Sequence, residues 1–511
     1  MIKRILSLGI CLFSFVVILS QNDLDAIRYS RTGVGGSPRF VAMGGAFGAL
    51  GADVSCASYN PAGLGVFRKG EMIYSGGLKF TNSTSNFEGK SASALATNFI
   101  YSNFGLAYTT PSNNDPSKRN TFCFTNTQLQ NFDNTIQIAN GSTRSSISGD
   151  MVSQANKAQS LNQLDPSYEL MGYNSYLLDY DSAAGKFFSF VDPKRNVNLN
   201  RTIATTGRMN ELNFSFAQSV NDKFYFGISL GIPRIKYEST TTHSEADSND
   251  SMRITVNPDN TYSSTYVDGL PFFYTDKLGF NSLTYTEHFI TQGYGLNLKF
   301  GGIVRVNSNL RLGGYIHTPT IFYLTDTYNN SMSVSFDANP TVPVQVQYPD
   351  NVGKYDYKII TPMKYGINGA YIINKSGTVS MDIENINYSK ASLTSTTPTD
   401  FAGVDAVIKS KYKSAVNLRL GGEVVKGRAM FRAGYALYGS PFGGFLSGMF
   451  DRQTVSLGLG LRTKGSFFFD LAWTKTFTSE KYYMYSPSTP VKTDLNLMST
   501  SFIASIGLKF Q

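Results

Sequence analysis

Residues 455–474 read VSLGLGLRTKGSFFFDLAWT, and this stretch decides the fold. Large apolar residues occupy every second position on both sides of Thr463-Lys464-Gly465. They are Val455, Leu457, Leu459 and Leu461 before the turn, and Phe467, Phe469, Leu471 and Trp473 after it. Period-two alternation places these side chains on one face of a sheet and the intervening ones on the other. The stretch therefore predicts a β-hairpin with one strongly apolar face.

The same hairpin pattern recurs along the chain. Further short turns occur at Ser102-Asn103, Asn221-Asp222, Asn307-Ser308, Lys375-Ser376 and Lys426-Gly427. Each turn joins two strands of roughly ten residues, the length of a tilted bilayer crossing. One more strand precedes the first pair, near Lys69–Phe80, and one follows the last pair, near Ser499–Gln511. The pattern predicts about 14 strands, an even number that closes an antiparallel sheet without a free edge.

Long segments separate the hairpins at the opposite end of the predicted sheet. They lie near residues 81–93, 113–208, 239–289, 321–359, 390–412, 441–451 and 479–498. Short turns at one end and long loops at the other are typical of a bacterial outer-membrane barrel. The predicted fold is therefore all-β: a transmembrane antiparallel β-barrel over residues 66–511, with long extracellular loops.

Composition agrees with this fold and argues against a helical enzyme. The chain has 511 residues, of which only 16% are charged and 47 are glycine. Soluble globular proteins carry about 25% charged residues. A single apolar run, at the N-terminus, approaches the length of about 20 residues that a membrane-spanning helix needs.

The first 65 residues do not alternate. Lys3 and Arg4 precede an apolar stretch that ends at Leu19, which predicts a secretory signal peptide over residues 1–20. Residues 21–65, which we call the hatch, are rich in glycine and alanine and contain an Asn-Pro turn signal. We expect the hatch to pack inside the barrel lumen, against its wall.

Assigning leucine and phenylalanine to the lipid face places charged side chains in the lumen. The predicted lumen polar network is Lys299, Arg311, Asp382, Glu384, Arg419, Glu423, Arg432 and Asp470. Opposite charges in a barrel interior serve either as a structural ion-pair network or as a polar path. The sequence favours the structural role and leaves the other open.

No catalytic or metal-binding pattern stands out. Gly227-Ile228-Ser229-Leu230-Gly231 matches the string of an esterase elbow, but it lies inside an alternating strand, where the required strand-turn-helix is missing. The three histidines are far apart in sequence. We therefore expect no bound metal, no cofactor and no enzymatic activity. The sequence does not decide whether Cys56 and Cys123 form a disulfide. The net charge of +9 favours anionic lipid headgroups of the outer membrane over nucleic acid as partners.

Asn60-Pro61-Ala62 lies near the end of the hatch, before the first predicted strand. It resembles the motif between plug and first strand in the FadL-type family of outer-membrane transporters for long-chain fatty acids and hydrocarbons, which includes the TodX-like proteins. Similar matches follow in family order: Gly293–Asn297, Leu310–Gly313 with Thr318-Pro319, Met381–Ile383 with Tyr388-Ser389, and Phe431–Tyr435 with Ser440-Pro441. The resemblance implies a plugged 14-strand barrel in the bacterial outer membrane.

The resemblance implies that a hydrophobic small molecule first binds the external loops and then reaches a pocket near the hatch. The molecule is released when the hatch moves, and one exit route leads sideways through the barrel wall. The candidate pocket residues are Phe40, Met43, Phe47 and Leu50. The alternative is that these side chains only pack the interior of the plug. We expect a monomer, with passive movement down the ligand gradient.

The long segment near residues 113–208 departs from shorter members of the family. Asp165-Pro166 predicts a helix start, so part of this segment is expected to be helical. It serves either as a landing site for ligand or as a protective lid. A second function stays open: a barrel similar to the PorV-type components of a secretion system, which bind protein clients. A general porin fits less well, because the hatch is expected to fill the lumen.

Overall fold

The computed structural model describes residues 23–112, 115–158, 160–252, 254–256, 262–264, 279–337, 342–374, 376–396, 401–442, 450–485 and 491–510. The predicted signal peptide, residues 1–20, lies outside the described residues, as does Lys375 of one predicted turn. Among the described residues, no helix is long and apolar enough to cross a membrane.

Fourteen strands form a closed antiparallel barrel, which confirms the predicted fold class. Around the wall they are β1 (Gly70–Phe87), β2 (Lys90–Ser112), β3 (Asp115–Asn131), β7 (Val197–Val220), β8 (Phe224–Asp247), β11 (Phe280–Arg305), β12 (Leu310–His317), β15 (Lys364–Ile373), β16 (Gly377–Asn387), β18 (Ser414–Lys426), β19 (Ala429–Gly439), β20 (Phe450–Arg462), β21 (Phe467–Tyr483) and β22 (Lys492–Phe510). The last strand pairs with the first from Gly70 opposite Phe510 to Phe87 opposite Thr493, and this pairing closes the ring.

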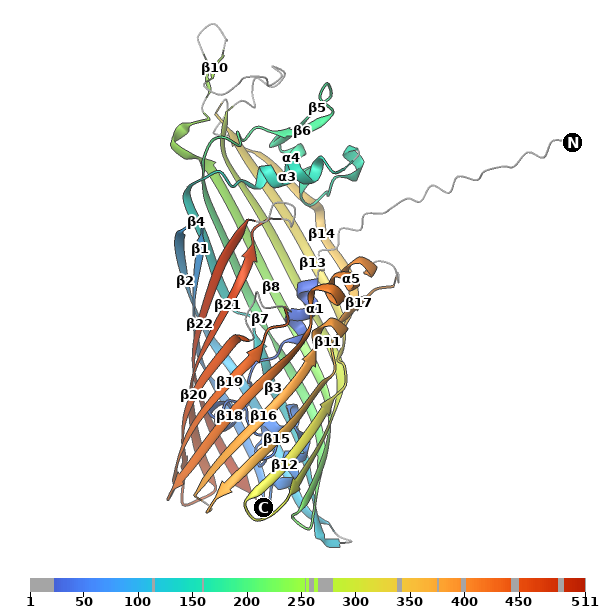
Figure 1. Cartoon of the computed structure of the whole chain (residues 1–511), viewed down its shortest axis with the longest axis vertical. Helices are drawn as coiled ribbons and strands as arrows, with labels where there is room; N and C mark the ends of the chain where they lie inside the picture. Colours follow the sequence, from blue (N-terminus) through green and yellow to red (C-terminus); the bar gives the residue numbers. More distant parts are fainter. Residues whose placement is uncertain are drawn as a thin grey trace, which may run out of the picture.

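Five of the six predicted turns join neighbouring strands, at the end of the barrel that also holds the C-terminus (Figure 1). In one of them, Asn221 and Asp222 adopt φ angles of 55° and 48°, in the left-handed region that asparagine and aspartate tolerate. The long connections lie at the other end, as the turn and loop lengths predict.

The sixth predicted turn, Ser102-Asn103, is wrong. β2 runs straight through it, with Ser75 opposite Asn103 and Gly76 opposite Tyr101, so Ser102 is the extra residue of a β-bulge. The bulge directs the Ser102 hydroxyl to the Gly36 carbonyl oxygen of the hatch, at 2.6 Å.

The predicted loop over residues 113–208 is also partly wrong, because it contains the complete wall strand β3 and the upper part of β7. The first predicted loop, residues 81–93, is reduced to a turn at Glu88-Gly89. Strands that extend above the membrane can be polar on both faces, so their sequences lose the alternation that marks a wall strand. The strand count stays correct because the false turn and the missed strand offset each other.

Two adjacent strands of the wall are interrupted at the same level. β12 stops at His317, and the chain continues as β13 (Ile321–Phe336) after Thr318-Pro319-Thr320. β14 (Val344–Ile360) continues as β15 after Thr361-Pro362-Met363. The Thr361 amide donates to the Thr320 carbonyl at 3.0 Å, so the two breaks face each other. Proline lacks the amide that a sheet ladder needs, which explains both interruptions.

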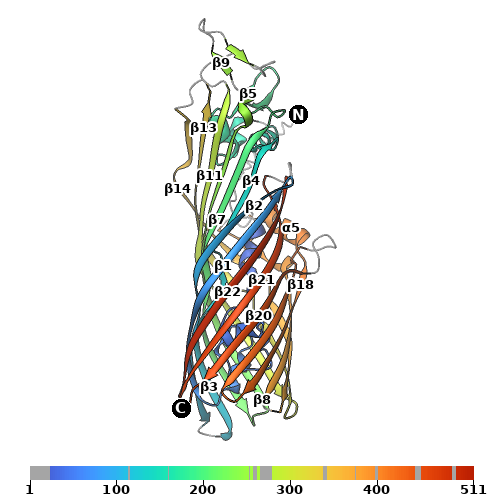
Figure 2. The ribbon, with the colours of Figure 1, turned by 90° about the vertical axis from the view of Figure 1, so that its left-hand side faces the viewer.

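One side of the wall rises well above the other (Figures 1 and 2). The tall side continues β7, β8, β11, β13 and β14 upward and carries a crown of short elements. These are β4 (Asn134–Thr143), α3 (Ile147–Ala155), η3 (Leu161–Gln163), α4 (Glu169–Asn174), β5 (Leu178–Asp181), β6 (Lys186–Ser189), η4 (Ser248–Asp250), β9 (Ile254–Val256) and β10 (Tyr262–Ser264). η5 (Tyr388–Lys390), β17 (Ser392–Thr394) and α5 (Ala402–Lys411) project at the level of the strand breaks.

The two faces of the barrel wall differ as alternation predicts. Outward side chains on the lower wall are large and apolar, for example Phe214, Phe226 and Leu471, each more than half exposed in the isolated chain. Inward neighbours are small or polar, for example Asn213 and Ser215. Such an apolar outer surface is typical of a barrel wall that contacts lipid.

Candidate functional site

The hatch contains four short helices. Those in the lower lumen are α2 (Pro38–Ala42), η1 (Val54–Ser58) and η2 (Pro61–Val66), while α1 (Asp23–Ser30) lies above them, beside α5 (Figure 1). Serine and aspartate side chains start two of them: Ser37 Oγ accepts from the Phe40 amide at 3.1 Å, and Asp53 accepts from the Ser55 amide at 2.9 Å. Ser37 Oγ also donates to Asp53 at 2.6 Å, which ties the two helix starts together.

Asn60-Pro61-Ala62 begins η2 and also fastens the hatch internally. The Asn60 Oδ1 atom accepts from the Ala62 amide at 3.1 Å, while Nδ2 donates to the Gly48 carbonyl at 2.7 Å. Pro61 occupies the first helical position, where its missing amide costs nothing. The turn predicted from this motif is therefore a capped helix start, and it lies against the barrel wall.

Changing Asn60 to aspartate tests this role. The variant keeps the oxygen that caps η2 but replaces the donor to Gly48 with a charge beside a carbonyl. We expect the hatch to lose about 1–3 kcal/mol of local stability, measured as faster hydrogen exchange over residues 48–66 in detergent. Asn86→Asp, on an exposed position of β1, is the matched control. Equal exchange in both variants contradicts the assigned role.

Wall glycines allow the hatch backbone to approach the barrel closely. A Cβ atom at Gly434 would lie 2.2 Å from the Gly44 amide nitrogen, and one at Gly421 would lie 2.4 Å from the Met43 carbonyl oxygen. On the opposite side of the lumen, a Cβ at Gly227 would lie 2.3 Å from the Pro61 carbonyl carbon. The hatch is therefore seated against backbone on both sides.

The predicted pocket residues form the core of the hatch. Phe40, Met43 and Phe47 are completely buried, and the Phe40 ring lies 5.2 Å from Phe47 and 4.6 Å from Tyr59, between centroids. Leu50 joins the same cluster, together with Val54. These side chains therefore pack against one another, and their role in ligand binding stays a prediction.

The structure directs all eight predicted lumen residues inward. Two of them bind Arg432: Glu423 at 2.7 Å and Asp470 at 2.5 Å. Glu423 also accepts two hydrogen bonds of 3.0 Å from Arg39 of α2. This four-residue cluster links the wall to the hatch.

A second cluster surrounds Arg419, which donates to Glu384 at 2.7 Å. Glu384 also accepts from Asn417 at 2.8 Å and from Tyr315 at 2.9 Å. Two other predicted residues hold backbone atoms of the hatch: Asp382 accepts from the Gly48 amide, and Arg311 donates to the Leu50 carbonyl at 2.7 Å.

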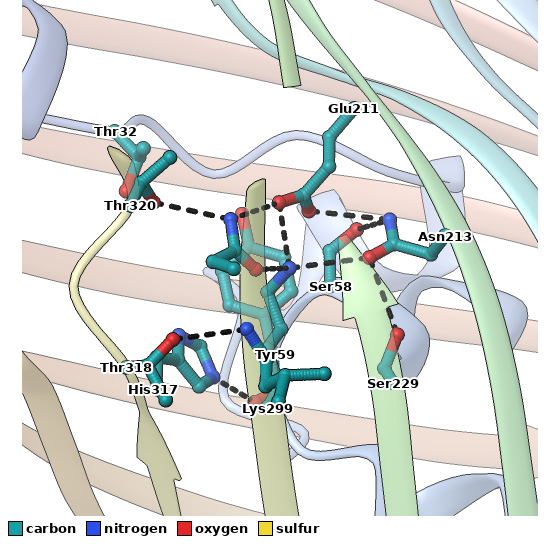
Figure 3. Close-up of polar contacts among 12 residues, drawn as sticks. Thr32, Ser58, Tyr59, Glu211, Asn213, Ser229, Lys299, His317, Thr318 and Thr320 are labelled. Carbon is teal, nitrogen blue, oxygen red and sulfur yellow. Dashed lines mark hydrogen bonds and ion pairs between the residues drawn. The ribbon is translucent and has the colours of Figure 1, made fainter. Parts of the chain in front are cut away.

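The third cluster, centred on Lys299, is drawn in Figure 3. The Lys299 ammonium donates to Glu211 at 2.6 Å, to Asn213 at 3.1 Å and to Asn297 at 3.0 Å. Asn213 in turn donates to Ser58 of the hatch at 3.0 Å. The same figure shows His317 bonded to the Tyr59 carbonyl, at 2.5 Å.

Sequence reasoning missed Arg39, Glu211 and Asn213. Glu211 and Asn213 could have been found, because they alternate with Leu212 and Phe214 and so share the inward face. Arg39 lies outside any alternating strand, and no sequence signal pairs it with Glu423.

A cavity of about 50 Å³ lies between the hatch and the wall beside the strand breaks, lined by Tyr29, Tyr59, Glu211, Lys299 and His317 among others. That volume holds one or two water molecules. This cavity is therefore too small for a ligand of the size of a fatty acid.

Other candidate chemistry is structural. Ser229 lies in the middle of β8 and accepts from Ser215 at 2.8 Å. His243 contacts Glu245 at 2.7 Å, a carboxylate that the sequence analysis did not connect to it. Cys56 and Cys123 are buried free thiols. Within the described ranges, no group of three or more histidine, cysteine, aspartate or glutamate residues could hold a metal ion.

The crown contains one carboxyl group with an unusual pKa. Glu169 of α4 accepts a hydrogen bond from the Asp165 amide at 2.9 Å. Burial, with the nearby Asp165 charge, raises the pKa of Glu169 to about 7. A raised carboxyl pKa stabilises the crown fully below the unfolded pKa of 4.5, and this contribution is lost as the pH rises through about 7.

Glu169→Gln keeps the acceptor for Asp165 and removes the charge. We therefore expect the variant to protect α3 and α4 from proteolysis better than the parent at pH 8, and equally at pH 5. Limited proteolysis at the two pH values measures the difference. A gain of the same size at both pH values would show that ionisation of Glu169 is not involved.

These features define a plugged antiparallel barrel of the outer-membrane type. Its fold is that of the FadL/TodX-type channels. The chain matches a FadL homologue of Pseudomonas aeruginosa with a TM-score of 0.53 and 14% identity, over 94% of this chain and 99% of that one. It matches the toluene transporter TodX of Pseudomonas putida with a TM-score of 0.50 and 12% identity, over the same shares of the two chains. No protein-family model and no curated protein sequence matches this chain significantly.

Proposed function

We propose that this protein resides in the bacterial outer membrane and lets hydrophobic small molecules, such as long-chain fatty acids or hydrocarbons, pass down their gradient. The observation that carries the proposal is a 14-strand barrel of this fold with a hatch packed against its inner wall. An open lumen would suit hydrophilic solutes, as in a porin. A lumen occupied by a hatch with an apolar core suits a ligand that is recognised before it passes.

In this proposal, the contacts that hold the hatch in place control passage. The hatch is held at its margin by ion pairs and hydrogen bonds, including Arg39 with Glu423 and the Gly48 amide with Asp382. All of these bonds can break and re-form without covalent change. Displacement of α2 exposes the side chains of Phe40, Met43 and Phe47, which then offer an apolar surface to ligand.

The second candidate function is binding of protein clients, as in PorV-type barrels. One observation favours it. Within the described strands, β14 pairs with β13 along its length but with β17 only at Lys358–Ile360. The rest of its second edge offers backbone groups to which an extended peptide could add as a strand.

Mass spectrometry of what co-purifies with the protein distinguishes the two functions. The barrel is extracted from its native membrane in mild detergent and analysed intact. A stoichiometric fatty acid or hydrocarbon is the expected result. A stoichiometric secreted protein, with no hydrophobic small molecule, would overturn the proposal in favour of client binding.

A further inference from the structure

The outer surface of the tall wall carries a groove that neither the hatch nor the lumen uses. It has a volume of about 940 Å³ and runs across the outward faces of β7, β8, β11, β13 and β14. Its outward-facing cationic and aromatic lining residues are Arg208, Arg234, Lys236, Lys358, Tyr294 and Tyr323. We call it the outer-wall groove.

Strand register places these residues in two adjacent rows. In the upper row, Arg208 lies directly opposite Lys236, which lies opposite Gln292. In the lower row, Arg234 lies opposite Tyr294, which lies opposite Tyr323, and Lys358 follows on β14. The groove therefore has a cationic side on β7 and β8 and an aromatic floor on β11 and β13.

The cations of the groove are incompletely neutralised. Like charges directly opposite in a sheet, such as Arg208 and Lys236, destabilise it unless an anion lies between them. The Lys236 ammonium lies 3.9 Å from the Glu238 carboxylate. The Asp356 carboxylate accepts a hydrogen bond of 2.5 Å from the Thr325 hydroxyl. Arg208 and Arg234 have no ion pair within the described part of the chain. The arrangement provides a place for an external anion.

The aromatic floor suits a sugar ring. Tyr294 and Tyr323 stack with their ring centroids 5.8 Å apart and 28° between planes, and both rings are about half exposed. The Lys358 ammonium lies 5.0 Å from the Tyr323 centroid. A flat aromatic surface beside cations can hold the apolar face of a saccharide while its anionic groups meet arginine.

The groove lies where the apolar belt of the barrel ends. One row further down, the outward residues become Leu212 on β7, Leu296 on β11 and Ile321 on β13, all exposed. β7 and β11 then stay apolar outward toward the short-turn end, for example at Phe214 and Phe300. A molecule in the groove can thus place acyl chains along the belt and its headgroup among the cations.

We propose that the outer-wall groove binds a phosphorylated, acylated sugar lipid of the outer leaflet. The phosphates lie among Arg208, Arg234 and Lys236, the sugar rests on Tyr294 and Tyr323, and the acyl chains follow the belt below. The proposal does not depend on which ligand passes the hatch, so either can fail without the other.

The test uses the full protein in phosphatidylcholine nanodiscs that contain a synthetic diphosphorylated, hexa-acylated glucosamine disaccharide. Native mass spectrometry measures how much of this probe stays bound. The triple variant Arg208→Gln/Arg234→Gln/Lys236→Gln is expected to retain roughly tenfold less probe than the parent, or even less, because each cation near a lipid surface contributes separately. The single variant Arg208→Gln should show a partial loss, which keeps the test valid if the triple variant folds poorly.

The matched control removes three exposed cations at the short-turn end: Lys426→Gln/Arg428→Gln/Lys464→Gln. It is expected to retain the probe as the parent does. Retention of a dephosphorylated probe should fall as in the triple variant. The proposal is overturned if the single and triple variants both retain the probe fully, if phosphate removal has no effect, or if phosphatidylglycerol binds as well as the sugar lipid.

Discussion

Gly434→Leu is expected to expel the hatch while leaving the barrel intact. The three atoms nearest to the new Cβ all belong to the hatch backbone, with the Gly44 nitrogen 2.2 Å and the Met43 carbonyl carbon 2.3 Å away. Backbone cannot rotate aside as a side chain can, so the whole of α2 must shift. We expect an order-of-magnitude rise in single-channel conductance or liposome swelling, relative to a nearly silent parent.

Gly422→Leu is the control for this prediction. Gly422 is on β18, next to the hatch-facing Gly421, but points outward, and its closest contact for a Cβ is the Thr378 oxygen at 3.6 Å. This variant should stay closed. Conductance in both variants would show that the barrel wall, and not the hatch, responds to the added volume. A closed Gly434→Leu barrel would mean that the hatch does not seal the lumen.

The second large effect is expected from Arg432→Met. This change leaves Asp470 buried without its guanidinium partner, while Glu423 keeps Arg39. Loss of one partner from a buried ion pair typically costs about 3–5 kcal/mol. We expect a loss of this size in the free energy of unfolding, measured by urea titration of the barrel in lipid vesicles.

Two further variants serve as comparisons for Arg432→Met. Arg428→Met, at an exposed turn, should change the free energy of unfolding very little. Arg39→Met should loosen the hatch but lower barrel stability less than Arg432→Met, because Glu423 retains Arg432. Equal losses from Arg432→Met and Arg428→Met would contradict a structural role for the buried network.

The sequence predicted the wall best where strands cross the membrane. There, one face must be apolar and the other small or polar, so alternation marks each strand clearly, as in residues 455–474. The sequence pattern did not predict β3, because Asp115–Asn131 begins with charged residues and ends in asparagine and glutamine. Its middle does alternate, with Phe122 and Phe124 outward, but only over a short stretch.

The candidate site was predictable in its parts but not in its pairings. Strand parity alone directs Lys299 and Arg432 into the lumen. Which groups they meet depends on how the hatch folds and on which strands close the ring. The pairing of Arg39 with Glu423 joins residues 384 positions apart through a segment without periodicity, so no local pattern could indicate it.

The most direct test of the central claim is uptake of a radiolabelled long-chain fatty acid by cells that lack their own fatty-acid channel. Cells with the parent protein in the outer membrane should accumulate the label faster than cells with an empty vector, while uptake of a hydrophilic sugar of similar mass stays unchanged. If the two cell lines take up the fatty acid at the same rate, although the barrel is folded and present, hatch-controlled passage of hydrophobic molecules is contradicted.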